Sequence, residues 1–333
     1  MIAPEVGVIG AGGWGTALAI LMAQGGREVP LWGHDPEHIG LMESTRVNEK
    51  YLPGVKLPPG ILGTMNLADV VRAEVLFIAV PSKYLSEVCS RIAEATADRC
   101  PILVSCTKGV EQERGFLMSE VIAERIPSAT LAVLSGPNLA AEIAHSIPAA
   151  GVIGCEDQQA SEAVQRLFAG TTFRAYTSHD VRGIQLGGAL KNIFAIAAGV
   201  SDGLGLGENA RAALVTRALV EMTRLGIAMG GKHATFGGLS GIGDLMVTCF
   251  SPRSRNHQVG FKLGRGESLS SIISSMGSMV AEGIPTASSA QQAARRLSVE
   301  TPIIDEVTAV LGGQKTPAEA MKALMGRDLR AEE

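Results

Sequence analysis

Hydrophobic residues in the first half of the chain form short runs rich in Val, Ile and Leu, separated by segments with helical spacing. The runs predicted to be strands are Val6–Ile9, Val29–Trp32, Val75–Val80, Ile102–Ser105, Leu131–Leu134 and Ala149–Ile153. Segments such as Thr16–Gln24 and Tyr84–Ala95 lie between them and have the periodicity of helices. Nearly continuous apolar strands separated by helices are typical of a parallel sheet covered on both faces.

The hydrophobic pattern changes near His179, where strand-like runs give way to long segments rich in Ala, Leu, Met and Gly. The clearest helical segments there are Gly188–Val200, Ala210–Ala228, Ala287–Leu297 and Pro302–Leu311. We therefore predict an α/β domain with a parallel-rich sheet over residues 1–180, followed by an all-α domain over residues 181–333.

Composition and charge narrow the function classes. Of the 333 residues, 46% are hydrophobic and the net charge is −4, which argues against nucleic acid or an anionic membrane as the main partner. The five cysteines form no CxxC pair, which favours a reducing compartment without a disulfide framework or a metal site. We see no signal peptide, and the apolar run Ile193–Val200 is too short to span a bilayer. These features predict a cytoplasmic protein without stable membrane insertion.

A glycine-rich turn follows the first predicted strand and precedes a predicted helix. Gly10 would make the tight turn, Gly12 would let the backbone approach a pyrophosphate, and Gly15 would let the helix pack close to the strand. The free N–H groups and dipole of the helix N-terminus favour negative charge there. An ordinary structural turn is the alternative, but the strand and helix on either side favour a dinucleotide-binding loop.

The second predicted strand ends at His34 and Asp35. An acidic residue about 20 positions beyond the glycine loop usually binds the adenosine ribose and favours NAD. Asp35 lies slightly further along, and His34 could stack on adenine or meet a 2′-phosphate. Asp35 could also simply cap the next helix. The choice between NAD and NADP therefore stays open.

A dehydrogenase acting on a secondary alcohol also needs a proton acceptor, carbonyl-polarising donors and an anchor for the substrate. Lys191 lies in a helical segment almost devoid of other charge. Burial without a partner would lower its pKa from roughly 10.4 toward neutrality, as a lysine general base requires. The alternative is a lysine whose ammonium reaches solvent from a buried helix.

Lys108 follows a predicted strand, at the sheet edge where ligands of α/β proteins gather, although it could be an ordinary loop lysine. Asp244 and Thr248 share one face of a helix, where Asp244 could orient an ammonium or cap the helix. The basic stretch Ser251–His257 contains Arg255, whose guanidinium could bind phosphate. The alternative is that Ser251–His257 is an ordinary solvent-exposed basic loop, which is what such a stretch usually forms.

Assembled, these segments closely resemble the NAD(P)-dependent glycerol-3-phosphate dehydrogenases of the bacterial type. The shared signatures are GAGGWGTALA, SCTKG, LSGPNLAAEI, QLGGALKNIFAIAAGVSDGLGLGENARAAL, GIGDLMVTC and SRN, and the similarity extends from about Gly10 to about Gly283. The long signature around Lys191 is highly specific, whereas the glycine loop alone is not. The resemblance implies a Rossmann-type first domain and interconversion of glycerol 3-phosphate and dihydroxyacetone phosphate with NAD or NADP. It also implies a role in supplying glycerol 3-phosphate for phospholipid synthesis.

Residue roles follow from the resemblance by position. It implies that Lys191 is the proton acceptor and that Lys108 and Asp244 assist it. The predicted substrate contacts are Lys108, Gly136, Asn138, Lys191, Asp244, Thr248, Ser254, Arg255 and Asn256. The predicted cofactor contacts are Gly10, Gly12, Gly13, Trp14, Gly15, His34, Lys108, Ala140, Arg255, Val280 and Glu282.

Two positions depart from the family pattern. Many relatives have Ser where this chain has Gly13, which offers only its backbone. Asn138 replaces a Ser or Thr but can still donate and accept hydrogen bonds.

The resulting hypothesis is that Lys191 takes the C2 hydroxyl proton as hydride passes to the nicotinamide, while Lys108 and Asp244 hold neighbouring oxygens. The nearest rival is a β-hydroxyacid or ketopantoate-type dehydrogenase, which would show a carboxylate-binding cluster in place of SRN. A non-catalytic dinucleotide sensor would have no reason to keep Lys191, Asp244 and Arg255 together. Cofactor preference, direction, feedback inhibition and a possible homodimer are not fixed by the sequence.

Overall fold

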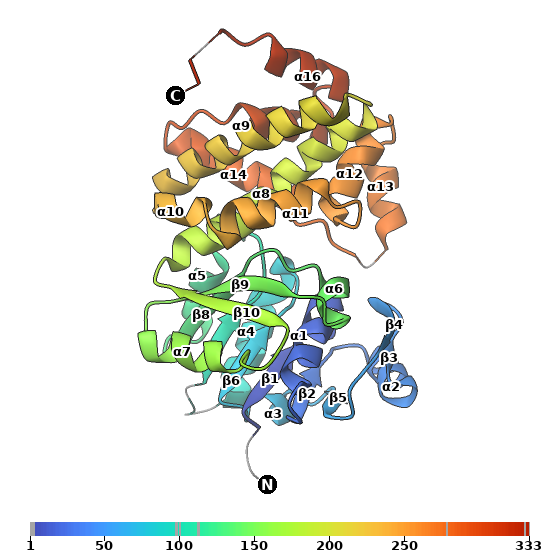
Figure 1. The fold of residues 1–333 in the computed structure, drawn as a ribbon, viewed down its shortest axis with the longest axis vertical. Helices are drawn as coiled ribbons and strands as arrows, with labels where there is room; N and C mark the ends of the chain where they lie inside the picture. The colour runs from blue at the N-terminus through green and yellow to red at the C-terminus, as the bar shows by residue number, and fades with distance from the viewer. Residues whose placement is uncertain are drawn as a thin grey trace. The chain divides into compact units, whose positions relative to one another are not determined.

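A computed structural model describes residues 4–96, 99, 101–111, 114–277, 279–329 and 331–332. The chain divides into two compact units (Figure 1). The first contains the described residues up to Gln185 except Arg114 and Gly115, which belong with residues 186 onward to the second. The domain boundary at Asp180 stays a prediction, and the division by contacts falls a few residues beyond it.

The first unit is built on an eight-stranded sheet with the order β10-β9-β8-β7-β6-β1-β2-β5. Its strands are β1 (Val6–Ile9), β2 (Val29–Trp32), β5 (Ile61–Thr64), β6 (Val75–Ile78), β7 (Ile102–Ser105), β8 (Thr130–Ser135), β9 (Ala149–Cys155) and β10 (Phe173–Ser178). All neighbours are parallel except β8 and β9. The parallel-rich α/β class is confirmed.

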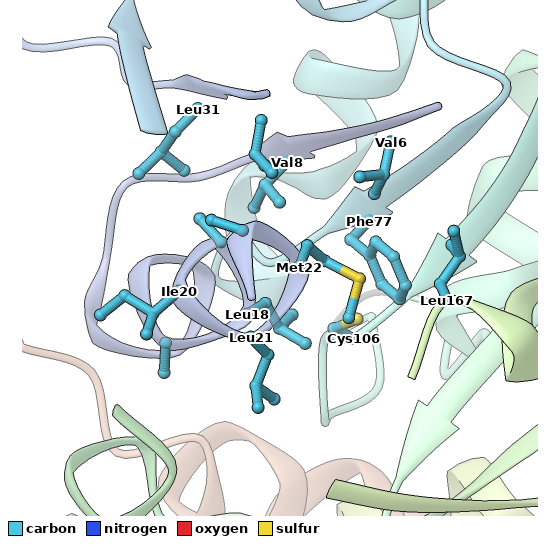
Figure 2. Close-up of a cluster of buried hydrophobic side chains, with 14 of the residues drawn as sticks. Val6, Val8, Leu18, Ile20, Leu21, Met22, Leu31, Phe77, Cys106 and Leu167 are labelled. Atoms are coloured by element: carbon cyan, nitrogen blue, oxygen red, sulfur yellow. The ribbon is translucent and has the colours of Figure 1, made fainter. Parts of the chain in front are cut away.

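Helices complete the first unit: α1 (Gly13–Ala23), α2 (Pro36–Thr45), α3 (Leu67–Val70), α4 (Ser82–Thr96), α5 (Met118–Arg125), α6 (Ala140–Ala144) and α7 (Gln158–Arg166). Helix α1 has no charged residue and is almost wholly buried, as a central helix over a sheet requires. Leu18 and Met22 of α1 pack with Val8 and Phe77 of the sheet (Figure 2). This packing fixes the glycine turn at the start of α1.

The structure adds strands that the hydrophobic pattern did not predict. In β10, Arg174 and Thr177 are exposed and Phe173 is buried, so this edge strand lacks a continuous apolar run. In the edge strand β5 only Ile61 is buried, and β3 (Val47–Asn48) pairs with β4 (Leu52–Lys56) in a separate antiparallel ribbon. Helix α6 packs against α1, and β9 then returns antiparallel to β8.

Helices joined by loops make up the regular secondary structure of the second unit in its described residues after Gln185, which confirms the all-α prediction. Its helices are α8 (Val181–Gly203, which begins in the first unit), α9 (Gly207–Ala228), α10 (His233–Phe236), the π-helical turn η1 (Leu239–Gly243), α11 (Asp244–Phe250), α12 (Arg255–Gly264), α13 (Leu269–Met276), α14 (Gly283–Arg296), α15 (Pro302–Leu311) and α16 (Pro317–Met325).

Helix α8 is the one described helix long and apolar enough to cross a membrane. Its most apolar window is 89% buried inside the structure, so α8 is a core helix. Glycines on both α8 and α12 allow these two helices to approach each other very closely. A Cβ at Gly199 would collide with the His257 carbonyl, and one at Gly260 would collide with the Ile196 carbonyl. The two helices are therefore in backbone contact.

Candidate active site

The glycine turn has the local geometry that the sequence predicts. Gly10 has a φ of +116°, which L side chains rarely adopt, and a Cβ at Gly15 would collide with the Gly10 carbonyl. At Gly12, in contrast, a Cβ would meet no atom within 4 Å. A side chain at Gly10 or Gly15 would therefore disturb the backbone of the protein itself. Gly12, in contrast, borders open space that a ligand can enter.

Several features of this turn suit a pyrophosphate and its dinucleotide. The N-cap of α1 is Gly12, which supplies no side-chain cap, and the first turn contains no acidic residue. Its N–H groups and dipole are therefore available to an anion. Nearby, the indole Nε1 of Trp14 is buried and faces the Cys106 thiol, a weak acceptor, without a well-aligned hydrogen bond to the protein. A buried donor of this kind needs an acceptor, which a ligand or water can supply.

Side chains from β3 and α2 support the turn and were not singled out from the sequence. Asn48 is 1% exposed, and its Nδ2 donates to the Ala11 carbonyl at 3.0 Å and to Thr16 Oγ1 at 2.7 Å. The His38 Nε2 lies 3.2 Å from the same carbonyl. These contacts orient the Ala11 peptide within the turn. In the sequence these side chains are ordinary polar residues, and nothing in their spacing predicts that they contact the glycine turn.

His34 and Asp35 follow β2, as predicted. His34 is exposed, and its contact with a dinucleotide stays a prediction. Asp35 is the N-cap of α2 and accepts a hydrogen bond from the His38 N–H at 3.2 Å. This hydrogen bond lowers the pKa of Asp35, with a further contribution from the Lys50 ammonium at 3.3 Å. The capping alternative is therefore confirmed, and a ribose contact by Asp35 stays open.

Lys108 lies just beyond β7 and contacts the segment that follows β8. Its Nζ donates to the Gly136 carbonyl at 2.9 Å and to Asn138 Oδ1 at 2.6 Å. The Asn138 Nδ2 is buried without a protein partner. Ala140 lies close enough for its Cβ to be 3.9 Å from a Cβ built at Gly13. These predicted site residues of the first unit thus gather at the carboxyl ends of β1, β7 and β8.

Lys191 is buried in the second unit, with its side chain 8% exposed. Lys191 is not buried without a partner, as the expected lowering of its pKa assumed. Its Nζ lies 2.7 Å from Asp244 Oδ1 and donates to Thr248 Oγ1 at 2.6 Å. Asp244 is itself 1% exposed. A carboxylate at this distance offsets the large free-energy cost of burying the ammonium. The alternative of a lysine reaching solvent is also wrong.

Thr248 fixes the geometry of this pair. Its hydroxyl donates to the Asp244 backbone carbonyl at 2.6 Å, one turn earlier on α11. Its oxygen is then oriented to accept from Lys191. Thr248 therefore contacts the predicted proton acceptor, while its contact with substrate stays a prediction.

The SRN segment forms the start of α12. Ser254 caps the helix by accepting from the His257 N–H at 3.3 Å. Asn256 is buried, donates to Asn192 Oδ1 at 2.8 Å, and accepts from the Gly283 N–H at 2.9 Å. Asn192, directly after Lys191, was not predicted as a site residue. It links the lysine helix to α12, and Asn256 links α12 to α14.

Arg255 is exposed, whereas Ser254, Asn256 and His257 beside it are buried. Desolvation by surrounding protein lowers its pKa, opposed by the charge of Glu282. An exposed guanidinium nevertheless remains protonated under physiological conditions. Glu282 and Val280 are half-buried just before α14. The structure thus brings Arg255 near Glu282, while the cofactor contacts predicted for Arg255, Val280 and Glu282 stay predictions.

The described residues include no group of three or more His, Cys, Asp or Glu that could hold a metal ion. Cys89, Cys106, Cys155 and Cys249 are free and buried, and Cys100 lies outside the described residues. Burial raises the pKa of the Cys89 thiol to about 12, as it does for Cys249. These buried thiols are therefore poor nucleophiles.

The glycine turn on a parallel-rich sheet and a buried lysine–carboxylate pair in a helical unit together define a class, the two-domain nicotinamide-dependent dehydrogenases. Family models specify it further. Residues 5–161 match the NAD-dependent glycerol-3-phosphate dehydrogenase N-terminus, and residues 180–322 match the C-terminus of the same family. The chain belongs to the NAD-dependent glycerol-3-phosphate dehydrogenase family.

Individual relatives agree with this assignment. The chain is 45% identical to a glycerol-3-phosphate dehydrogenase [NAD(P)+] of Geobacter sulfurreducens, with 98% of each chain covered. The crystal structure of glycerol-3-phosphate dehydrogenase from Coxiella burnetii superimposes with a TM-score of 0.92 at 36% identity, covering 97% of this chain and 99% of that one. A ketopantoate reductase from Ralstonia eutropha, covering 95% and 99%, gives a TM-score of 0.60 at 16% identity and shares the fold alone.

Proposed function

We propose that this chain interconverts sn-glycerol 3-phosphate and dihydroxyacetone phosphate with NAD or NADP, using Lys191 as the proton acceptor and donor. The observation that carries this role is the buried Lys191 ammonium, 2.7 Å from Asp244 and 2.6 Å from Thr248. The relatives named glycerol-3-phosphate dehydrogenase [NAD(P)+] support the substrate and the cofactors. The ketopantoate-type alternative is weaker, because its representatives share only the fold.

A nicotinamide, when bound, accepts a hydride from the alcohol carbon or returns it to the carbonyl carbon. In the direction of reduction, the Lys191 ammonium donates one proton to the C2 oxygen, and the resulting amine is reprotonated afterwards. In the direction of oxidation, the neutral Lys191 amine takes the C2 hydroxyl proton. Asp244 holds the ammonium in place, and Thr248 sets its direction.

Other residues would bind the remaining groups of the ligands. Lys108, already held by Gly136 and Asn138, can donate to a substrate oxygen or to the cofactor. Arg255 presents a planar guanidinium, which suits the two oxygens of a phosphate. The uncapped start of α1 would bind the pyrophosphate, and the buried Trp14 Nε1 would find an acceptor in the ligand.

A Lys191→Ala variant tests the proposal directly. We expect kcat to fall by about 10²–10⁴, because one positioned acid and base is lost, while the NADH dissociation constant changes little. Initial rates with dihydroxyacetone phosphate and NADH, and fluorescence titration of NADH, measure the two quantities. Lys322→Ala on α16 is the matched control, since Lys322 is exposed. Turnover near that of the wild type would exclude Lys191 from the chemistry.

The cellular setting is also part of the proposal. The net charge of −4 and the burial of α8, the one helix of membrane-spanning length among the described residues, support a protein that works in the cytoplasm without stable membrane insertion. The product would serve phospholipid synthesis. A homodimer is a further proposal, which light scattering during size-exclusion chromatography would decide.

A further inference from the structure

Asp202 joins three helices of the second unit near the end of α8. Its Oδ2 lies 2.8 Å from His257 Nε2 on α12 and accepts from Arg211 Nη1 on α9 at 2.9 Å. The His257 side chain is 8% exposed and that of Asp202 is 20% exposed. The Arg211 guanidinium lies 5.0 Å from the Phe250 ring. None of these residues has a role in the proposed proton transfer.

His257 is held at its backbone as well as at its side chain. Its N–H donates to Ser254 Oγ at 3.3 Å, and its carbonyl faces Gly199, where a Cβ would collide with it. The side chain then reaches Asp202, three residues beyond Gly199 on α8. The first turn of α12 is consequently fixed against α8 at one end of the lysine helix.

The neighbouring residue fixes the same turn at a second point. Asn256 bonds to Asn192, which is ten residues before Asp202 and about 15 Å from it along the helix axis. Helix α8 thus holds α12 through Asn192 and Asp202, and it also carries Lys191. Arg255 precedes these two buried anchors and is itself exposed. Its direction depends on how the anchored turn is held.

We propose that Asp202 and His257 are positioning residues for phosphate recognition. By holding the first turn of α12 against α8, they set the direction of Arg255 relative to Lys191. The inference rests on the proposed function, because it assumes that Arg255 binds the substrate phosphate. It predicts that the pair matters for phosphorylated substrates and much less for unphosphorylated ones.

The primary test compares KM and kcat for dihydroxyacetone phosphate and for dihydroxyacetone in His257→Ala. We expect KM for the phosphorylated substrate to rise about tenfold, the size expected if the misdirected Arg255 loses one charge-assisted hydrogen bond to the phosphate. We expect kcat to fall by less, and kcat/KM for dihydroxyacetone to change little. His257→Gln should restore most of the loss, because its amide nitrogen can donate to Asp202.

Val259→Ala is the matched control for packing. Val259 is 1% exposed on the same helix and has no part in the pair. This variant should lower thermal stability without changing the preference for the phosphorylated substrate. An equal change of that preference in Val259→Ala would reduce His257 to an ordinary packing residue and overturn the proposal.

A double-mutant cycle links His257 to Arg255. If His257 acts through Arg255, its replacement in an Arg255→Ala background should have little further effect on the phosphate preference. Full additivity would overturn the inference. Should His257→Ala fail to fold, Asp202→Asn, which keeps the side-chain shape, provides the same comparison. Failure of the proposed function itself would differ, since the wild type would then show no preference for the phosphorylated substrate.

Discussion

The glycine turn of the first unit and the lysine site of the second are built in opposite ways. The turn lies within six consecutive residues, Gly10–Gly15, and leaves the buried Trp14 Nε1 without a well-aligned protein acceptor. The lysine site draws Lys191, Asp244 and Asn256 from three helices, and it pairs the polar groups around Lys191 within the protein. The N–H groups at the start of α1 are thus available to a ligand, whereas the polar groups around Lys191 are already paired within the protein.

This difference agrees with the chemistry of each site. A pyrophosphate brings its own charge and satisfies backbone N–H groups, so the protein needs only a close and open approach. A proton acceptor must stand at one place and in one direction, so its side chain is held by neighbours. Removing one residue should therefore have different consequences in the two units.

The largest expected effect is in Asp244→Ala. This change leaves the Lys191 ammonium buried without its carboxylate, which should lower the free energy of unfolding by about 3–5 kcal/mol. The matching change in the first unit is Asn138→Ala, which removes one partner of the half-buried Lys108 and should cost about 1 kcal/mol. Urea denaturation of the full chain measures both. Equal losses would break the contrast between the two sites.

A pair of glycine substitutions gives the next largest effect. In Gly15→Ala, the new Cβ collides with the Gly10 carbonyl. This collision should lower the free energy of unfolding by about 1–3 kcal/mol and should also weaken dinucleotide binding. In Gly12→Ala, the Cβ enters open space, so the fold should keep its melting temperature. NADH affinity should still fall about tenfold, because the methyl group occupies the approach to the backbone. Unchanged NADH affinity in Gly12→Ala would place the pyrophosphate elsewhere.

The same contrast explains what the sequence could predict. The strands β1, β2 and β7 were predicted to the residue, because continuous apolar runs mark strands buried on both faces. The edge strand β10 was missed, because its exposed residues break that run. Gly10–Gly15 could be interpreted locally, since every part of its function lies within one turn.

The lysine site could be predicted only in part. A lone lysine in an apolar helix marked Lys191, but its partner Asp244 is 53 positions away and was placed near it through family resemblance. The pair of Asp202 and His257 was missed, because neither residue stands in an unusual local context. Such pairs arise when helices pack, and hydrophobic periodicity does not specify which polar side chains then meet.

A smaller effect is expected at Glu221, a buried carboxyl group of the second unit outside the lysine site. It lies on α9, is 2% exposed, and accepts from the Ile303 and Ile304 N–H groups at 2.9 Å each, which caps α15. Burial raises its pKa to about 7, opposed by these N–H groups and by Arg224, whereas Asp305 adds to the increase. Glu221 thus resembles Lys191 in its burial but has neutral hydrogen-bond partners.

The sign of the pH dependence follows from that raised pKa. The contribution of Glu221 to stability is fully present below its ordinary pKa of 4.5 and is lost as the pH rises through about 7. Between pH 5 and 8 we expect a decrease of about 2 kcal/mol in the free energy of unfolding, measured by urea titration. Glu221→Gln, which keeps the size and an acceptor oxygen, should remove this part of the pH dependence. If the variant keeps the wild-type pH profile, Glu221 does not titrate between pH 5 and 8 in the folded protein, and the pH dependence of stability comes from other groups.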